Sequence, residues 1–341
     1  QWSATLLYTP GDWYSDAVAG AGALQGGRRR ALNGFNLRPG YWAGSAASWT
    51  DLANPGQPEQ SGEVLAMSGN RQAGKVGQIP CVWNGSWETR IDLTVPAGMN
   101  QGFVRPFGMA GEQIVGQGRV GNIPDTAILW PTPASAPIIM NPPGISRALL
   151  YDTDGTRQVG AIYPPGGSRT QAAMWFGTPS SYVNLNPFPN YSTALAAIGG
   201  DQQVGAAGDI GTGQTVAGLW RGTAESFVNL NPFGAQGGSI AWDTNGWMQV
   251  GAVSAPGAFF GRAAAWFGTP ESWVDLQAFL PPDTSYSVAR AIGEANGVYY
   301  IAGFMDRQGI TQAVVWTFVP APGSGAALAF LALFASRRRR R

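Results

Sequence analysis

Seven tryptophans divide this chain into units of similar length. Neighbouring members of the set are 41 to 50 residues apart, so the interval is nearly constant over most of the chain. A fixed period of this size is typical of a repeat architecture, in which each unit repeats the same small group of secondary-structure elements. The seven are Trp42, Trp83, Trp130, Trp175, Trp220, Trp266 and Trp316.

The residues around these tryptophans repeat as well. Residues 172–185 read AAMWFGTPSSYVNL, residues 217–230 read AGLWRGTAESFVNL and residues 263–276 read AAAWFGTPESWVDL. Each unit continues with a small-residue stretch and closes on a Gln-Val-Gly-like segment. The small-residue stretches are Ser-x-Ala at 15–17, 146–148, 192–194, 239–241 and 287–289; the closing segments are 158–160, 203–205 and 249–251, with looser forms at 24–26, 72–74, 113–116 and 301–303.

Each unit therefore contains four short segments that fit four β-strands. They are rich in Trp, Val, Ile, Tyr and Phe, and clusters of Gly, Pro, Asn and Asp bound them. Residues 152–155 (Asp-Thr-Asp-Gly) and 243–246 (Asp-Thr-Asn-Gly) lie between the third and fourth segments, where they fit tight hairpin turns. A repeated four-stranded unit of this length predicts the blades of a β-propeller.

The two ends of the chain complement each other. Residues 5–10 align with residues 227–232, so the chain begins inside a unit that lacks its tryptophan strand. It ends its repeats on a lone tryptophan strand, residues 312–316. We expect this last strand to pair with the three N-terminal strands, which closes a seven-bladed all-β ring and leaves no blade edge open. The propeller domain then covers residues 1–318.

The composition excludes several classes of function. The chain has no histidine, which rules out Ser-His-Asp and Cys-His catalytic sets and histidine-containing zinc sites. Its only cysteine is Cys81, which takes the place of Ala173 and Ala264 in other units and is expected to be a small buried thiol. Apart from five terminal arginines, the chain has 16 basic and 20 acidic residues and no basic stripe, so nucleic acid is not an expected partner. No cofactor motif is present.

Carboxylates and aromatic residues remain as candidates. Asp152 and Asp154 are possible calcium ligands, although the same residues are explained by hairpin-turn chemistry. A glycosidase-like pair needs only two acids at a suitable separation, and the sequence does not select one. The chain has 14 Trp, 10 Tyr and 15 Phe, whose flat faces can stack on sugars; for the seven repeat tryptophans we expect packing inside the blades.

The C-terminal segment, residues 319–341, has a different character. Val319, Pro320, Ala321 and Pro322 come first, ten apolar residues run from 326 to 335, and Arg337, Arg338, Arg339, Arg340 and Arg341 end the chain. This order resembles the PEP-CTERM class of bacterial C-terminal sorting signals, with Ala321 at the position of the usual glutamate. The resemblance implies export, a short hydrophobic helix that anchors transiently in the inner membrane, and cleavage near the proline motif by an exosortase-type enzyme. The arginines are expected on the cytoplasmic side; retention of the tail as an anchor is the alternative.

The repeats more loosely resemble the extracellular HAF-type repeat family. That resemblance implies an extracellular location and says little about activity. The first residue is Gln1, so either a signal peptide has been removed or the sequence is a fragment.

The sequence therefore predicts a secreted or cell-surface bacterial repeat protein. We expect it to act as a non-enzymatic binding or matrix module whose partner is an extracellular polysaccharide or a surface protein. The alternative is a carboxylate-based glycan hydrolase or lyase on the same scaffold.

Overall fold

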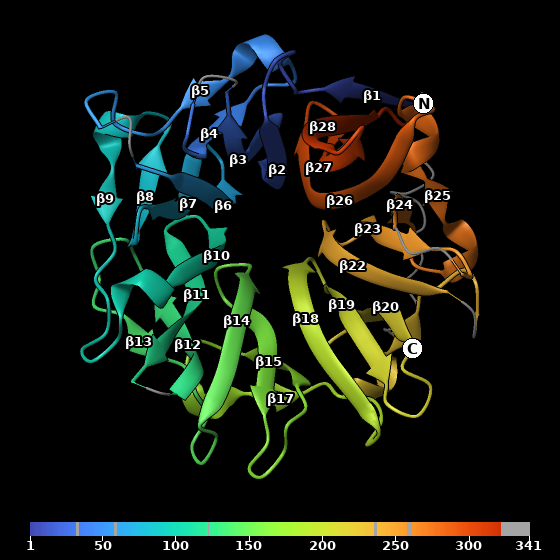
Figure 1. Cartoon of the computed structure of the whole chain (residues 1–341). Coiled ribbons are helices and arrows are strands. Elements are labelled where there is room, and N and C mark those ends of the chain that lie inside the picture. The colour runs from blue at the N-terminus through green and yellow to red at the C-terminus, as the bar shows by residue number, and fades with distance from the viewer. Residues whose placement is uncertain (32–33, 58–59, 122, 235–236, 258–260, 322–341) are drawn as a thin grey trace.

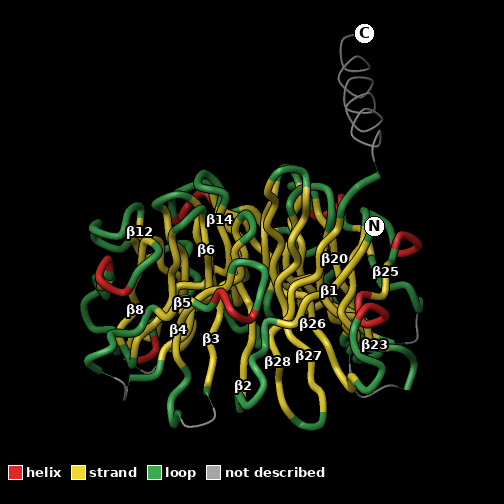
Figure 2. Tube along the Cα trace, turned by 90° about the horizontal axis from the view of Figure 1, so that it is seen from above, coloured by secondary structure: helices red, strands yellow, loops and turns green. Residues whose placement is uncertain are grey.

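The chain forms a ring of seven β-sheets around a common centre (Figure 1). The computed structural model describes residues 1–31, 34–57, 60–121, 123–234, 237–257 and 261–321. Seen from the side, the ring is a disc whose strands run between its two faces (Figure 2). Each sheet has four antiparallel strands, so the predicted seven-bladed β-propeller is confirmed.

Each blade is a meander that runs from the centre of the ring to its outside. Blades 1 to 6 begin at β2, β6, β10, β14, β18 and β22, and blade 7 begins at β26. The inner strands are β2 (Tyr14–Ala21), β6 (Gly62–Ser68), β10 (Arg105–Ala110), β14 (Arg147–Thr153), β18 (Tyr191–Gly199), β22 (Gly238–Thr244) and β26 (Thr284–Ala295). The second strands are β3 (Leu24–Arg30), β7 (Arg71–Val76), β11 (Gln113–Val120), β15 (Gln158–Tyr163), β19 (Gln202–Asp209), β23 (Gln249–Ser254) and β27 (Val298–Arg307).

The tryptophan strands come third, and short strands form the outer edge. The tryptophan strands are β4 (Arg38–Trp42), β8 (Ile79–Asn84), β12 (Ile123–Trp130), β16 (Gln171–Trp175), β20 (Thr215–Trp220), β24 (Arg262–Trp266) and β28 (Ile310–Phe318). The outer strands are β5 (Thr50–Asp51), β9 (Ile91–Asp92), β13 (Ile138–Ile139), β17 (Val183–Asn184), β21 (Val228–Asn229), β25 (Val274–Asp275) and, in blade 7, β1 (Trp2–Leu6). Short 3₁₀ turns lie in the loops between strands: η1 (Ala46–Ser48), η2 (Trp87–Thr89), η3 (Gln101–Phe103), η4 (Pro179–Ser181), η5 (Ala224–Ser226), η6 (Pro270–Ser272) and η7 (Leu276–Phe279).

The ring is closed by the N-terminal strand. Strand β1 pairs antiparallel with β28, from Trp2 opposite Phe318 to Leu6 opposite Val314. Leu7 follows β1, is fully buried, and its backbone N–H donates to the carbonyl of Ala313. In Figure 1 the blue N-terminal strand lies beside the red strands of blade 7. The predicted pairing of the C-terminal strand with the N-terminus is therefore confirmed.

Two details of that prediction are wrong. Only one N-terminal strand joins blade 7, because β2 and β3 belong to blade 1 and β26 and β27 complete blade 7 from the C-terminal side. Tight turns join the Ser-x-Ala, Gln-Val-Gly and tryptophan strands of each blade in sequence. The two ends of the chain therefore meet in blade 7 between its tryptophan strand and its outer strand. The predicted alignment of residues 5–10 with residues 227–232 is also shifted by one residue. Leu7, and not Tyr8, occupies the place of Leu230, whose N–H donates to the carbonyl of Ala217.

The repeat tryptophans form the interior of the ring. All seven are at most 1% exposed, and they pack among apolar residues from two neighbouring blades. Trp266, for example, lies in one cluster with Ala197 and Val204 of blade 5 and Ala241 of blade 6. Their expected role as packing residues is confirmed, and adhesion between blades rests largely on this buried apolar surface.

Five blades hold a buried glutamine opposite the tryptophan. Its side-chain oxygen accepts a hydrogen bond from the glycine N–H two residues after that tryptophan, as Gln203 does from Gly222 at 2.7 Å. In blades 3 and 7 the same position is Ile114 or Ile301, and no glycine follows the tryptophan. The repeated glutamine thus stabilises a glycine turn, which has a positive φ at Gly222.

The repeated glycine of the second strand has a steric cause. In every blade a Cβ added at this glycine would lie between 1.9 and 2.1 Å from a carbonyl oxygen of the inner strand. The inner strand has a β-bulge at this level, which brings its backbone over the glycine. The seven glycines are Gly27, Gly74, Gly116, Gly160, Gly205, Gly251 and Gly303.

We expect Gly205→Ala to destabilise the fold by about 1–3 kcal/mol, because its new Cβ would meet the Ala194 carbonyl oxygen at 2.0 Å. Gly208→Ala on the same strand is the control, since its Cβ would find its nearest neighbour at 3.5 Å. Urea unfolding of both variants gives the comparison. Equal free energies of unfolding for the two would contradict the steric explanation.

The described residues stop just inside the predicted sorting segment. Val319 and Pro320 follow β28 directly, and the N–H of Val319 donates to the carbonyl of Gln1. Pro322, the predicted hydrophobic helix and Arg337 to Arg341 lie outside the described residues. Among the residues that are described, no helix has the length and apolar character that crossing a membrane requires.

Candidate functional site: the central channel

The bulges of the inner strands place one residue per blade on the channel wall. At each bulge the register against the second strand shifts by one residue, and the extra residue is left without a partner. Each extra residue is partly exposed, whereas the residue before it is buried. All seven line the same cavity: Val18, Leu65, Phe107, Tyr151, Ala196, Trp242 and Arg290. We call these seven the bulge ring.

The channel cavity has a volume of about 450 Å³. Its wall is mostly apolar, and its aromatic members come from blades 3, 4 and 6. The rings of Phe107 and Tyr151 are adjacent, with centroids 5.7 Å apart. Blade 5 has only Ala196 at this level, which leaves room on the wall between Tyr151 and Trp242. A concave apolar surface with a few polar groups is the usual form of a small-ligand site.

Two carboxylates occupy equivalent places in this wall. The residue after the bulge is Ala or Gly in five blades and is Asp152 in blade 4 and Asp243 in blade 6. Each Asp reaches the inner strand of the next blade: Asp152 Oδ2 accepts from Ile198 N at 3.0 Å, and Asp243 Oδ2 accepts from Ile292 N at 2.7 Å. Because the inner strand is a sheet edge, these contacts satisfy N–H groups that no strand pairs with.

Both carboxyl groups hold their protons unusually tightly. Burial raises the pKa of Asp152 to about 8, with a further increase from the negative charge of Asp243. Burial likewise raises the pKa of Asp243 to about 7, although its backbone hydrogen bonds and Arg290 act in the opposite direction. Near neutral pH each carboxyl can therefore take up or release a proton inside the channel.

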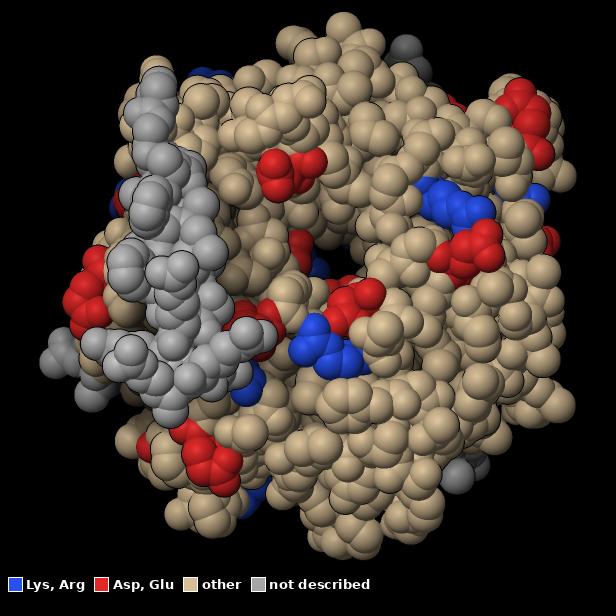
Figure 3. Space-filling model, turned by 180° about the vertical axis from the view of Figure 1, so that it is seen from behind, with Lys and Arg blue, Asp and Glu red and all other residues tan. Residues whose placement is uncertain are grey.

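One basic side chain joins this wall. Arg290, the bulge residue of blade 7, lies over the ring of Trp242 with its guanidinium carbon 3.9 Å from the ring centroid. It also borders a second hollow of about 590 Å³ formed by blades 5, 6 and 7, lined by Ser239, Ser254 and Tyr286 among others. We call this hollow the side groove. Figure 3 shows the hole through the ring, with acidic and basic atoms near its rim.

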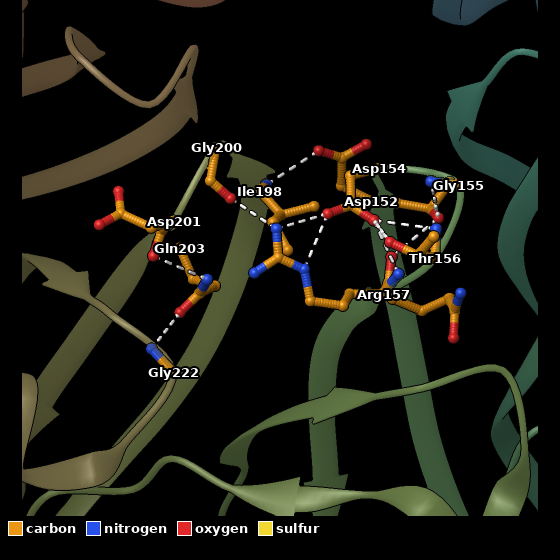
Figure 4. Close-up of polar contacts among 12 residues, drawn as sticks. Asp152, Asp154, Gly155, Thr156, Arg157, Ile198, Gly200, Asp201, Gln203 and Gly222 are labelled. Atoms are coloured by element: carbon orange, nitrogen blue, oxygen red, sulfur yellow. Dashed lines mark hydrogen bonds and ion pairs between the residues drawn. The ribbon is translucent and has the colours of Figure 1, made fainter. Parts of the chain in front are cut away.

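The two predicted calcium ligands make different structural contacts. Asp152 contacts the next blade, whereas the Asp154 carboxylate accepts from Thr156 N, Arg157 N and Arg157 Nε within its own hairpin turn (Figure 4). Burial alone would raise the pKa of Asp154, but the hydrogen bonds from these donors lower it below its usual value. In the described ranges no three acidic or cysteine side chains gather as metal ligands. The contacts of Asp154 are those of the hairpin turn.

Sequence reasoning missed most of the channel wall. It singled out Asp152, and it grouped Asp243 with it only as an equivalent turn residue. Trp242 and Arg290 could not be recognised as wall residues, because the extra residue of a bulge is not restricted to one residue type. The one available clue was the glycine opposite each bulge. Cys81 is fully buried as expected, and burial raises the pKa of its thiol to about 12.

Known proteins match this chain in fold and not in sequence. No protein-family model matches it, and no curated protein sequence does. An oligogalacturonate lyase from Vibrio parahaemolyticus is 10% identical with a TM-score of 0.62, over 93% of this chain and 94% of the lyase. TolB from Acinetobacter baumannii is 13% identical with a TM-score of 0.52, over 74% of this chain and 62% of TolB.

A prolyl endopeptidase structure is 12% identical with a TM-score of 0.49, over 91% of this chain. The match covers 51% of the peptidase chain, so this protein corresponds to about half of it. At these identities the matches show the β-propeller fold alone.

The raised pKa values predict a pH-dependent stability. Asp152 and Asp243 have folded-state pKa values of about 8 and about 7, above the value of about 3.9 expected in the unfolded chain. Between these limits the native state binds more protons at the two carboxyls, so their contribution to stability is greatest at low pH and is lost as pH rises from about 4 to 8. We expect the Tm of the double variant Asp152→Asn/Asp243→Asn, relative to that of the wild type, to increase as the pH rises from 5 to 8.5. The exposed Asp201→Asn is the control, and a constant Tm difference would contradict the raised pKa values.

Proposed function

We propose that this protein binds a saccharide in its central channel and acts as an exported binding module. The observation that carries the proposal is the bulge ring, which presents Phe107, Tyr151 and Trp242 on the wall of one cavity. Aromatic faces supply stacking surface for a sugar ring, and polar groups beside them orient its hydroxyls. Asp152 and Asp243 are such groups, because both border the same cavity.

The contrast between bulge positions and repeat positions supports this use. Aromatic residues that serve only the fold are buried, as the seven repeat tryptophans are. Tyr151 and Trp242 are instead partly exposed to a hollow that the fold does not fill. Burial raises the pKa of Tyr151 to about 12, which keeps its hydroxyl neutral and able to both donate and accept.

Export remains part of the proposal through the C-terminal segment. The order of proline motif, apolar stretch and arginine cluster in residues 319–341 supports secretion or surface display with processing by an exosortase-type enzyme. Intact mass of the protein from its native cells tests this point. A chain that ends near residues 319–322 supports cleavage, whereas a full-length chain in the cytoplasmic fraction would overturn export.

The binding test is a titration with a panel of soluble oligosaccharides, followed by calorimetry. We expect at least one oligosaccharide to bind the wild type, and Trp242→Ala and Tyr151→Ala to weaken it by tenfold or more. Trp13→Ala is the control, because Trp13 is 57% exposed and does not line the channel. Absence of binding across neutral and acidic oligosaccharides would refute a saccharide site.

A second candidate is a carboxylate-based glycan hydrolase or lyase. Asp152 and Asp243 favour it, since two acids with pKa values of about 8 and about 7 share one channel and can act as acid and base. The matched fold includes an oligogalacturonate lyase, so the scaffold is compatible with such chemistry. Release of new reducing ends or unsaturated products from a glycan, lost in both Asp152→Asn and Asp243→Asn, would establish the enzyme over the binding module.

A further inference from the structure

Arg290 is the one charged member of the bulge ring. The six equivalent residues are Val18, Leu65, Phe107, Tyr151, Ala196 and Trp242, none of which carries a charge. The fold therefore does not require an arginine at this position. A cation placed there calls for a separate explanation.

This guanidinium has no anionic contact. Over the ranges that the structure describes, Arg290 makes no ion pair or hydrogen bond, and its Nε is buried without a partner. Eleven other arginines of these ranges do lie within 4.0 Å of a carboxylate: Arg28, Arg29, Arg38, Arg71, Arg90, Arg105, Arg147, Arg157, Arg221, Arg262 and Arg307.

The two acids whose charges act on Arg290 do not pair with it. Asp16 and Asp243 act on Arg290 through their charges but make no contact with it. Asp16 Oδ2 accepts from Tyr14 and from Arg28, whereas Asp16 Oδ1 is buried without a hydrogen-bond partner. Asp243 accepts from Ile292 N and Thr244 N. Burial lowers the pKa of Arg290, yet a guanidinium keeps its charge in a protein. A buried donor without a partner is costly, so an anion supplied by a ligand would give the Nε of Arg290 the partner that the protein does not.

The geometry also prepares Arg290 for such an anion. Arg290 lies against the ring of Trp242, which restrains the guanidinium, and the planar fork of its donors matches the two oxygens of a carboxylate. Arg290 borders both the channel cavity and the side groove, so a ligand in either can reach it. The adjacent aromatic face of the wall belongs to the saccharide site proposed above.

We propose that Arg290 makes the channel site selective for saccharides that carry a carboxylate. This inference rests on the proposed function of the channel and names the chemical class of its ligand. The carboxylate would accept hydrogen bonds from the Arg290 guanidinium, while the sugar ring lies against the aromatic part of the bulge ring. Asp152 and Asp243, when protonated, add donors without adding repulsion.

The test compares matched oligosaccharides of equal length, one of glucuronate, one of glucose and one of sulfated glucose, by calorimetry at low salt. We expect the glucuronate oligomer to bind the wild type at least tenfold more tightly than either of the others. Arg290→Met keeps the length of the side chain and removes the charge, and should abolish this preference by lowering the affinity for the glucuronate oligomer at least tenfold. Arg169→Met, at an exposed position outside both hollows, is the control for net charge.

The outcomes separate the two proposals. If glucose and glucuronate oligomers bind equally, or Arg290→Met keeps the preference, the inference about Arg290 is wrong and the saccharide site stands. If the sulfated oligomer binds most tightly, selectivity for carboxylates is overturned. If no oligomer binds, the proposed function itself fails.

Discussion

Removal of residues 1–7 should open the ring and destabilise the protein more than any single substitution in a blade core. The deletion takes away β1, which forms the outer edge of blade 7, and Leu7, which is fully buried among residues of blades 7 and 1. Truncation of a buried leucine alone costs about 2–5 kcal/mol. The deletion also exposes the unpaired backbone of β28, which is a template for association with another chain. We therefore expect a large fall in Tm together with self-association in sedimentation velocity.

Two point variants make this prediction specific. Leu7 and Leu230 are both fully buried, and each donates its N–H to the tryptophan strand three residues before the tryptophan. If the N-terminal strand is an ordinary part of its blade, Leu7→Ala and Leu230→Ala should lower the free energy of unfolding by similar amounts. A monomeric deletion variant that keeps the wild-type Tm would show that β1 does not close the ring.

Trp220→Ala is expected to destabilise the protein by about 3–5 kcal/mol, the range for removing a buried aromatic side chain. Trp220 is fully buried and packs with apolar residues of blades 4 and 5, including Val159, Leu195 and Val216. The loss of one ring leaves a cavity between two blades that the surrounding strands cannot fill. Equilibrium unfolding in urea measures the effect.

Trp13→Ala provides the matched control for that change. Trp13 is 57% exposed, so its removal should alter the free energy of unfolding far less than that of Trp220. Similar losses for the two variants would contradict the role of the repeat tryptophans as the cores between blades.

The sequence predicts the scaffold well because the scaffold repeats. Trp220 and its equivalents are fixed by burial, and Gly205 and its equivalents are fixed by a backbone approach that no side chain tolerates. Each constraint acts once per blade and so produces a period. The starting point of a blade is harder to predict, because a cyclic order of four strands reads the same from any of them. Only pairing decides that β1 alone joins blade 7.

The channel wall is less predictable because it is where the blades differ. Asp152 and Asp243 stand where five blades have Ala or Gly, and Arg290 stands where the others have uncharged residues. These differences become visible only when the bulges are aligned. Deviations from the repeat are therefore the residues to examine for function, since the fold does not demand them.

The placement of the bulge residues is the central claim, and cysteine labelling tests it most directly. The native Cys81 is fully buried and should stay silent toward a small maleimide. In folded protein, a cysteine at the bulge position Ala196 should react, whereas a cysteine at the preceding, fully buried Leu195 should not. A bound saccharide should protect Ala196→Cys from labelling. Equal reactivity at the two positions would show that the bulge does not turn one residue per blade into the channel.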